Sequence, residues 1–383
     1  MVVKTTLPPT MVAHFADVAD PRTGPNASHK FIDIMVIAIC AVISGADDYV
    51  AISDYGKAKE TWFKQCLELP SGIPSHDTFW RVFGAIDPEQ FKKCFLTWMS
   101  AVRKATFGEV IAIDGKRLRR SYAKEDDKAA IHMVSAWATT NRLVLAQQKV
   151  DEKSNEITAI PKLLNCLDLH GCLVTIDAMG CQTEIANLIV ERGGDYLLSL
   201  KGNQSRLHED VILLFDDLAE SNFKAYEFDE ARSVGKDHGR IEVRQCWTIS
   251  DPDIIRFLHG AEKWRGLSTV VKVQSERYIG EKWSVESRYF IASTQDTAEV
   301  TLQNTRDHWQ IENSLHWVLD IAFREDECRI RKDNGPQNFA ILRHIALNLL
   351  NQEKTSKSGI KNRRLRAGWD NKYLLKILQT LFS

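Results

Sequence analysis

The run VIAIDGKRLRR, from Val110 to Arg120, is the stretch on which the fold prediction depends. Its apolar start favours a short buried strand, and this strand ends on the carboxylate of Asp114. Gly115 and a basic run follow directly. A second apolar run, CLVTIDAMG, repeats the pattern and ends on Asp177. Two carboxylates therefore stand at the ends of two predicted strands.

The segments around these strands predict the order of the elements. IHMVSAWATT and RLVLAQQKV favour an antiparallel hairpin, and a helix follows from about Ile157. After the strand that ends on Asp177, the pattern predicts a helix over Gln182–Arg192 and a strand in DYLLSL. The resulting order, three strands, helix, strand, helix, strand, is that of a ribonuclease-H-like α/β core, a mixed sheet with flanking helices. Because its first and fourth strands are neighbours, we expect Asp114 beside Asp177.

A later helix carries a third carboxylate. In TRDHWQIENSLHWVLDIAFREDECRIR, from Thr305 to Arg331, the residues Ile311, Leu315, Val318 and Ala322 form an apolar stripe at helical spacing. His308, Glu312 and His316 recur every fourth residue and form a second, polar stripe. If this helix packs across the sheet, Glu312 reaches the two aspartates.

Two other interpretations of that polar stripe stay open at this point. It is compatible with an ordinary solvated helix face. It is also compatible with a zinc site, although H-x-x-x-E-x-x-x-H is not the H-E-x-x-H spacing of zinc proteases.

Composition sets outer limits on the function. The chain has 383 residues, 44% of them hydrophobic, and a net charge of -1, so any binding of nucleic acid must depend on local basic patches. Its eight cysteines include no C-x-x-C pair, which favours reduced thiols in a cytosolic protein. No signal peptide is predicted, and the longest apolar run, Phe31–Ala46, is short and interrupted by Asp33, so no membrane span is expected.

The remaining segments predict the domain organisation. Residues 8–103 have mostly helical patterns and predict a small helical N-terminal domain. Residues 108–350 contain the predicted core, interrupted at about 222–293 by alternating runs that favour a mostly β insertion. Residues 351–383 form a basic tail that includes Arg363, Arg364, Trp369 and Tyr373, and this tail is either solvated or a phosphate-contacting arm.

Asp114, Asp177 and Glu312 together predict a metal-dependent chemistry. Carboxylates can hold two divalent ions roughly 3.5–4 Å apart, which activate an attacking oxygen and stabilise a leaving one in phosphodiester displacement. Mg²⁺ suits such a site because it keeps positions open for water and phosphate. Asp114, on the central strand, is the expected bridge between the ions, with Asp177 on one ion and Glu312 on the other.

The chain also resembles a known family. AIDGKRLRRS, DEKSNEITAIPKLL, TIDAMGCQ, GGDYLLSLKGNQ, HGRIEVR and HWQIENSLHWVLDIAFREDECRIR closely resemble the H-repeat-associated insertion-sequence transposases of the DDE class. The resemblance extends over nearly the whole chain and includes FIDIMVIAICAVISGA and GIPSHDTFWRV near the start. It implies a transposase-associated N-terminal domain, a ribonuclease-H-like catalytic core, and a catalytic, metal-binding triad at Asp114, Asp177 and Glu312.

The chain departs from a related pattern around the glutamate. Related insertion-sequence transposases carry Y-x-x-R-x-x-x-E-x-x-x-x-x-x-K there, whereas this chain has Thr305, His308 and Leu319 at the Tyr, Arg and Lys positions. Other cations must therefore hold the phosphates. The predicted DNA contacts are Lys116, Arg117, Arg119, Lys201, His238, Arg240, Arg329, Arg331, Arg363 and Arg364. His308 and His316 are expected to support the metal ligands from behind.

The resemblance implies a cytosolic bacterial DNA transposase. It would use two Mg²⁺ ions, or Mn²⁺ in their place, to cut double-stranded DNA at terminal inverted repeats and join the 3′-hydroxyl ends to target DNA. A homodimer on DNA is implied by the family. The alternatives are an inert, transposase-derived DNA-binding protein and a metal-dependent nuclease that cuts without joining.

Overall fold

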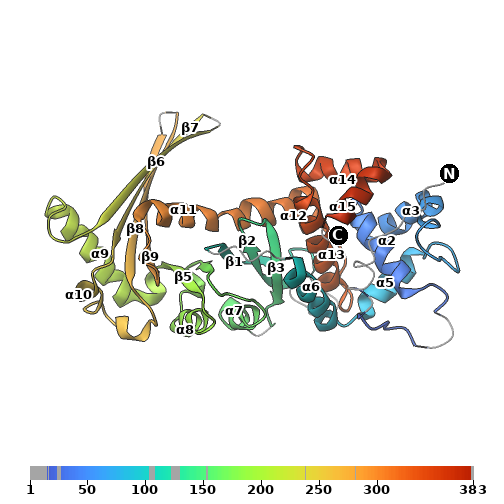
Figure 1. Cartoon of the computed structure of the whole chain (residues 1–383), viewed down its shortest axis with the longest axis horizontal. Helices are drawn as coiled ribbons and strands as arrows, with labels where there is room; N and C mark the ends of the chain where they lie inside the picture. Colours follow the sequence, from blue (N-terminus) through green and yellow to red (C-terminus); the bar gives the residue numbers. More distant parts are fainter. Residues whose placement is uncertain are drawn as a thin grey trace.

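The computed structural model describes residues 15, 17–23, 27–102, 108–121, 130–151, 154–237, 239–280 and 282–380. The molecule is elongated, with helices at one end, a sheet across the middle and a long antiparallel extension at the other end (Figure 1). The predicted mixed α/β class and the helical N-terminal region are confirmed. Among these residues, no helix is both long and apolar enough to cross a membrane.

The sheet of the described chain runs in the order β3-β2-β1-β4-β5-β9-β8-β7-β6. The first and fourth strands pair in parallel, with Ile113 opposite Ile176, so their predicted adjacency is confirmed. Asp114 and Asp177 directly follow this pair of residues and therefore lie side by side. The first strand was predicted to end on Asp114, but it continues to Arg117, because residues 115–117 still pair with the second strand. The strands are β1 (Val110–Arg117), β2 (His132–Ala138), β3 (Leu143–Lys149), β4 (Leu173–Ile176), β5 (Asp195–Leu200), β6 (Asp229–Asp237), β7 (Arg240–Ile249), β8 (Thr269–Ile279) and β9 (Lys282–Ala292).

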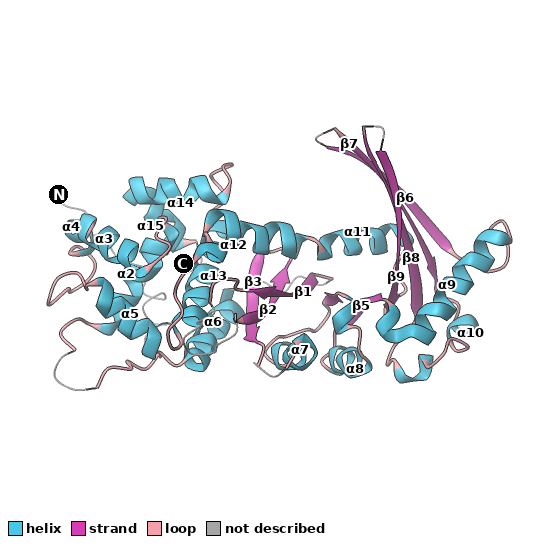
Figure 2. Ribbon diagram, turned by 180° about the vertical axis from the view of Figure 1, so that it is seen from behind, coloured by secondary structure: helices cyan, strands magenta, loops and turns pink. Residues whose placement is uncertain are grey.

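Helices cover both faces of the central strands (Figure 2). Side chains alternate between faces along a strand. Ile111 and Ile113 on β1 therefore point into one core with α7 (Glu156–Leu164) and α8 (Thr183–Glu191). Val110 instead belongs to a cluster with the first turns of α11 (Ala298–His308), on the opposite face. This packing fixes α11 and the residues after it against the sheet.

The strands β6 to β9 extend the same sheet. Strand β9 pairs antiparallel with β5, with Leu197 opposite Ala292. The inner ends of β8 and β9 are buried, whereas their far ends, around Tyr278 and Trp283, are exposed. Their outer halves curve away from the body of the molecule (Figure 1), and α9 (Ser205–Glu220) and α10 (Pro252–Ile255) lie at the same end.

The helical end is built from both ends of the described chain. One hydrophobic core joins N-terminal helices to C-terminal ones, and within it α2 packs on α13. Residues 33–43 of α2 are all buried, which explains the long apolar run in the sequence. The helices here are α2 (Phe31–Ile43), α3 (Tyr49–Ala58), α4 (Glu60–Phe63), α5 (His76–Ala85), α6 (Pro88–Val102), α13 (Gly335–Gln352), α14 (Ile360–Trp369) and α15 (Asn371–Gln379).

Residues 351–380 of the basic tail pack into this core, and the prediction that Arg363 and Arg364 contact DNA is wrong. Arg364 is 3% exposed; it donates to the carbonyls of Val42, Ala46 and Ala322 and pairs with Asp47 at 2.9 Å. Arg363 donates to four backbone carbonyls, including those of Leu350 and Glu353 at the end of α13. Both guanidinium groups are used to satisfy backbone oxygens and are not available to phosphates.

Candidate active site

Two carboxylates come from the sheet. Asp114 lies in the second half of β1, and its Oδ1 accepts a hydrogen bond from the Gly115 amide at 2.8 Å. Asp177 directly follows β4, and its Oδ1 accepts from the Met179 amide at 3.2 Å, which caps a short 3-10 turn. Because β1 and β4 are parallel neighbours, their apolar residues place the two carboxylates side by side where β4 ends.

The third carboxylate comes from a π-helical turn. The segment after α11 continues as a π-helix over Ile311–His316 and then as α12 (Trp317–Ala322). The buried Ile311 and Leu315 hold this turn on the core, as the apolar stripe predicts. The turn itself was not predicted, and π-bulges occur frequently at functional sites. It presents Glu312 and His316 toward β1.

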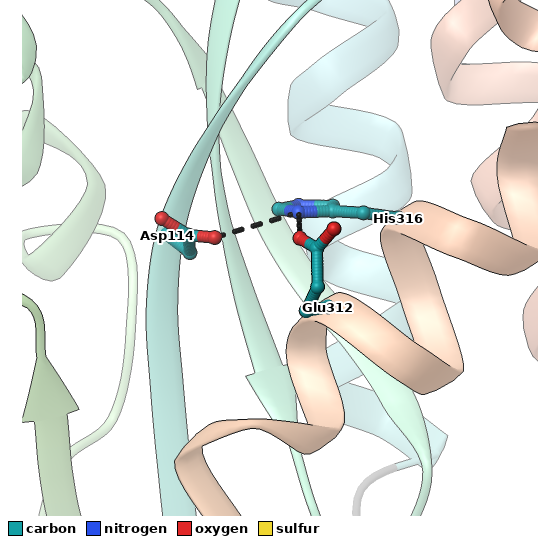
Figure 3. A group of neighbouring side chains, drawn as sticks. All are labelled: Asp114, Glu312 and His316. Carbon is teal, nitrogen blue, oxygen red and sulfur yellow. Dashed lines mark hydrogen bonds and ion pairs between the residues drawn. The ribbon is translucent and has the colours of Figure 1, made fainter. Parts of the chain in front are cut away.

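Asp114, Glu312 and His316 point toward one another (Figure 3). The distance from His316 Nδ1 is 3.1 Å to Glu312 Oε2 and 3.5 Å to Asp114 Oδ2. One ligand atom from each of the three residues lies within 4.8 Å of the other two. We call these three residues and Asp177 the acidic corner. The imidazole of His316 is almost fully buried, whereas the Glu312 side chain is about half exposed.

The charges in the acidic corner influence one another. Burial raises the pKa of Asp114, and the nearby carboxylates of Asp177 and Glu312 raise it further, against the opposing effect of His316. The hydrogen bond from His316 lowers the pKa of Glu312. A buried, like-charged group of this kind favours a cation between its members.

The donor set fits a divalent cation. Carboxylate oxygens are the preferred ligands of Mg²⁺ and Mn²⁺, and imidazole is a frequent ligand of first-row transition metals. Asp177 lies close enough to affect Asp114 electrostatically but is not part of the tight three-residue group. The described chain therefore offers one compact group of ligands and one adjacent carboxylate.

His308 occupies a different place from His316. Its Nδ1 lies 3.0 Å from Thr175 Oγ1 on β4, and burial lowers its pKa to about 4. With Asp177 it lines a cavity of about 160 Å³. His308 is thus a neutral ring next to Asp177, whereas His316 contacts Glu312.

Lys116 supports the site from within the protein, and the prediction that it contacts DNA is wrong. Its ammonium pairs with Asp320 and, at 3.0 Å, with Glu325, and it lies 3.3 Å from the His316 carbonyl. The side chain is only 12% exposed. This arrangement ties β1 to the π-helical turn and to α12, so Lys116 holds Glu312 and His316 in place.

A fourth carboxylate, Glu156, was missed in the sequence. It is the first residue of α7, and its Oε1 lies 2.8 Å from His132 Nε2. A Cβ atom added to Gly115 would lie 2.1 Å from that oxygen, so the glycine after Asp114 lets Glu156 approach. Burial, followed by the charges of Asp177 and Asp114, raises the pKa of Glu156 to about 7. The signal in the sequence was the run NEITAIP, in which Asn155 caps α7 and so makes Glu156 its first residue.

An arginine-rich groove leads away from Asp177. The cavity beside Asp177 also contains Lys201, Arg288 and Trp309, and a cavity of about 320 Å³ shares Arg288 and Trp309 with it. The second cavity is lined by five arginines and two glutamates, namely Arg240, Arg244, Arg277, Arg288, Arg306, Glu242 and Glu286. We call these two adjoining cavities the arginine groove. Lys201 and Arg240 were predicted as DNA contacts and lie in it, whereas His238 lies outside the described residues.

Cations exceed anions in the arginine groove. The buried carboxylate of Glu242 lies 2.7 Å from Arg244, 3.3 Å from Arg277 and 3.6 Å from Arg240. Arg288 pairs with Glu286 at 2.8 Å, and its guanidinium carbon lies 4.8 Å from the centre of the Trp309 ring. Two carboxylates do not neutralise five guanidinium groups. The groove therefore favours an anionic ligand.

The other predicted basic residues lie outside the arginine groove. Arg329 and Arg331 line a third cavity, of about 790 Å³, together with Arg120 and the half-exposed Trp80. The Arg331 Nε donates to the Arg120 carbonyl at 3.0 Å. Arg117 is exposed at the end of β1, and Arg119 is exposed and pairs with Asp326 at 3.2 Å.

Comparison with known proteins places the chain in a family. A family model described as "Transposase DDE domain" matches residues 105–349, which is more than half of the chain. The chain belongs to the DDE transposase family. A second model, "DDE_Tnp_1-associated", matches residues 12–99 of this transposase-family chain.

Full-length relatives agree with this assignment. The "H repeat-associated putative transposase YhhI" of Escherichia coli (strain K12) is 42% identical over 96% of the chain and 97% of the relative. The "Putative transposase YncI" of Escherichia coli O157:H7 is 40% identical over 96% of the chain and 94% of the relative. A short relative, "Inactive transposase YbfQ" of strain K12, is 39% identical over 72 residues. Membership of this family supports a nuclease or transposase activity and implies DNA binding. Members of the family typically use a divalent metal.

Proposed function

We propose that this protein is a DNA transposase that cuts phosphodiester bonds at the terminal inverted repeats of an insertion sequence and joins the 3′-hydroxyl ends to target DNA. The observation that carries the proposal is the acidic corner. One ligand atom each of Asp114, Glu312 and His316 lies within 4.8 Å of the other two, and Asp177, on the neighbouring strand, lines the arginine groove. The strand order β3-β2-β1-β4-β5 supports a ribonuclease-H-like core with β6–β9 as its insertion.

The chain's own residues divide the work at the acidic corner. Asp114 would hold both Mg²⁺ ions, or Mn²⁺ in their place, with Asp177 on one and Glu312 on the other. These ions would supply activation of the attacking oxygen and stabilisation of the leaving one. The π-helical turn, held by Lys116 from β1, keeps Glu312 directed at Asp114. His308 stays neutral beside Asp177, because burial lowers its pKa to about 4, and so adds no charge to the site.

The arginine groove would hold a DNA strand on its way to Asp177. Arginines bind phosphate oxygens strongly, often with two hydrogen bonds. An exposed tryptophan flanked by an arginine, as Trp309 is by Arg288, provides a surface on which a base can stack. His308 occupies the position at which related transposases carry arginine, and Arg288 from β9 lines the same cavity as His308 and Asp177. Arg288 would therefore supply a phosphate-binding cation on the Asp177 side of the site.

We also propose a role for each of three segments of the chain. Residues 8–103 would form the transposase-associated domain, 108–350 the catalytic domain with its insertion at about 222–293, and 351–383 a tail that completes the helical core. Arg117, Arg119, Arg329 and Arg331 would contact flanking duplex DNA through its phosphates. The protein would act as a homodimer on two DNA ends in the bacterial cytosol.

The proposal is tested with labelled DNA that carries the element's own ends, a plasmid target, and the full-length protein. We expect cuts at the repeat tips and joined products with Mg²⁺, and neither with EDTA nor with Asp177→Ala. Cuts without joining would support a metal-dependent nuclease. Tight end binding without any cuts would support an inert DNA-binding protein.

A further inference from the structure

One ring nitrogen of His316 faces two carboxylates of the acidic corner at once. Its Nδ1 faces Glu312 Oε2 at 3.1 Å and Asp114 Oδ2 at 3.5 Å, so the same ring atom is directed at both carboxylates. One N–H group can donate a well-aligned hydrogen bond to only one of them. A hydrogen bond that orients Glu312 therefore leaves the approach of Asp114 to the same nitrogen unexplained.

The spacing of the three ligand atoms suits one cation. Metal–ligand bonds of ~2.1 Å in an octahedron place adjacent ligands about 3.0 Å apart and opposite ligands about 4.2 Å apart. The two distances from Nδ1, 3.1 Å and 3.5 Å, are close to the adjacent spacing, and all three atoms lie within 4.8 Å of one another. Only small side-chain movements are needed to bring them onto one ion.

The ring of His316 is held rigidly in this orientation. The side chain is 5% exposed, and the Lys116 ammonium lies 3.3 Å from the backbone carbonyl of the same residue. Glu312 and His316 belong to one π-helical turn, so their side chains leave the helix on the same side (Figure 3). Within the described chain, the other ring nitrogen, Nε2, is buried without a hydrogen-bond partner, so the hydrogen bonding of the ring is directed at the carboxylates.

We infer that His316 is itself a metal ligand, through Nδ1, and completes with Asp114 and Glu312 a site that prefers Mn²⁺ to Mg²⁺. The inference rests on the proposed function of the acidic corner as a metal centre. Mg²⁺ strongly favours oxygen ligands, whereas Mn²⁺ belongs to the first-row series that binds carboxylates and also accepts imidazole. The two ions of the site would then be unlike: one held with a nitrogen ligand, the other near Asp177 by oxygens alone.

The test is a nitrogen signal from bound Mn²⁺. The full-length protein is loaded with Mn²⁺ without DNA, and electron spin-echo envelope modulation measures coupling between the metal and directly bound ¹⁴N. We expect this coupling in the wild type and in His170→Asn, the matched control, because that ring is exposed in the turn before β4. We expect its loss in His316→Asn, which keeps an N–H donor near Glu312, and a fall in Mn²⁺ affinity of at least about tenfold.

A second variant separates metal choice from folding. His316→Asp should restore an all-oxygen ligand set and shift the ratio of Mn²⁺ to Mg²⁺ affinity, measured by calorimetry, toward Mg²⁺. Bound Mn²⁺ without ¹⁴N coupling in the wild type would overturn the inference and leave His316 as a positioning residue. So would Mg²⁺-dependent DNA cutting by a protein that does not bind Mn²⁺. Nitrogen coupling in a protein that never cuts DNA would instead support the ligand and overturn the proposed transposase function.

Discussion

Arginines at the helical end and arginines in the groove have opposite environments. At the helical end, Arg364 is buried and satisfied by three carbonyls and Asp47. In the groove, Arg240, Arg244 and Arg277 share the single carboxylate of Glu242 and face a cavity. Burial, together with the neighbouring charges of Arg306 and Arg240, lowers the pKa of Arg244 despite Glu242. A basic cluster in a sequence therefore indicates an anion-binding surface only where its charge remains uncompensated after folding.

The largest expected effect on stability comes from the helical end. Arg364→Gln leaves Asp47 and several buried carbonyls without their partner, which should lower the free energy of unfolding by about 3–5 kcal/mol. Urea unfolding measures this. The matched control is Arg366→Gln on the same helix, an exposed arginine that stacks on Tyr373 and should cost less than about 1 kcal/mol. A stable Arg364→Gln protein with weakened DNA binding would show that Arg364 contacts DNA and does not support the core.

A smaller effect on the free energy of unfolding is expected for Glu156, whose charge is opposite to that of the arginines. In EDTA, the folded protein should bind one more proton than the unfolded chain between pH 4.5, the ordinary pKa, and about 7, the raised one. The free energy of unfolding should therefore fall as pH rises through that window. Glu156→Gln should be more stable than the wild type above pH 7 by about 1–3 kcal/mol and equal to it below about pH 4.

The control for Glu156 is Glu191→Gln, an exposed glutamate on α8. Urea unfolding of both variants and the wild type over the pH range separates burial from simple loss of charge. A pH dependence in Glu156→Gln that matches the wild type would show that another group causes it.

The smallest effect on stability is expected in the arginine groove, where a substitution should instead weaken the binding of DNA. Arg288→Gln should leave stability within about 1 kcal/mol of the wild type, since its ion pair with Glu286 is partly exposed. It should weaken binding to DNA with an unpaired end by about tenfold and reduce the slope of log affinity against log salt by about one. Fluorescence anisotropy at several salt concentrations measures both quantities.

Arg256→Gln is the matched control for the groove. Arg256 also pairs with a carboxylate, Asp253 at 3.1 Å, and also stacks on an aromatic ring, Phe257 at 5.0 Å, but it lies on the far α10 segment. Equal losses of affinity in the two variants would mean that the groove has no special role.

Part of this structure could be predicted from the sequence. Short apolar runs that end on Asp114 and Asp177 predict the parallel pairing of β1 and β4, because buried strands and their turn signals are local. The apolar stripe at Ile311 and Leu315 likewise predicts a helix packed on the core. These features depend on residues close together in the chain.

The rest could not be predicted, because its partners are distant in the sequence. Lys116 pairs with Asp320, and Arg364 bonds to Val42, and no local pattern announces either contact. The π-helical turn is also hidden, since a four-residue polar spacing is the same for an α-helix. Glu156 was overlooked because it belongs to a polar stretch whose position depends on how closely α7 approaches Gly115.

We propose that Glu312 acts in the acidic corner. The most direct measurement compares Mg²⁺-dependent cutting of labelled terminal-repeat DNA by Glu312→Gln and by Glu299→Gln, an exposed glutamate in the first turn of α11. We expect that Glu312→Gln binds the ends but cuts at background level, whereas Glu299→Gln cuts like the wild type. Wild-type cutting by Glu312→Gln would contradict the assignment of this corner as the active site.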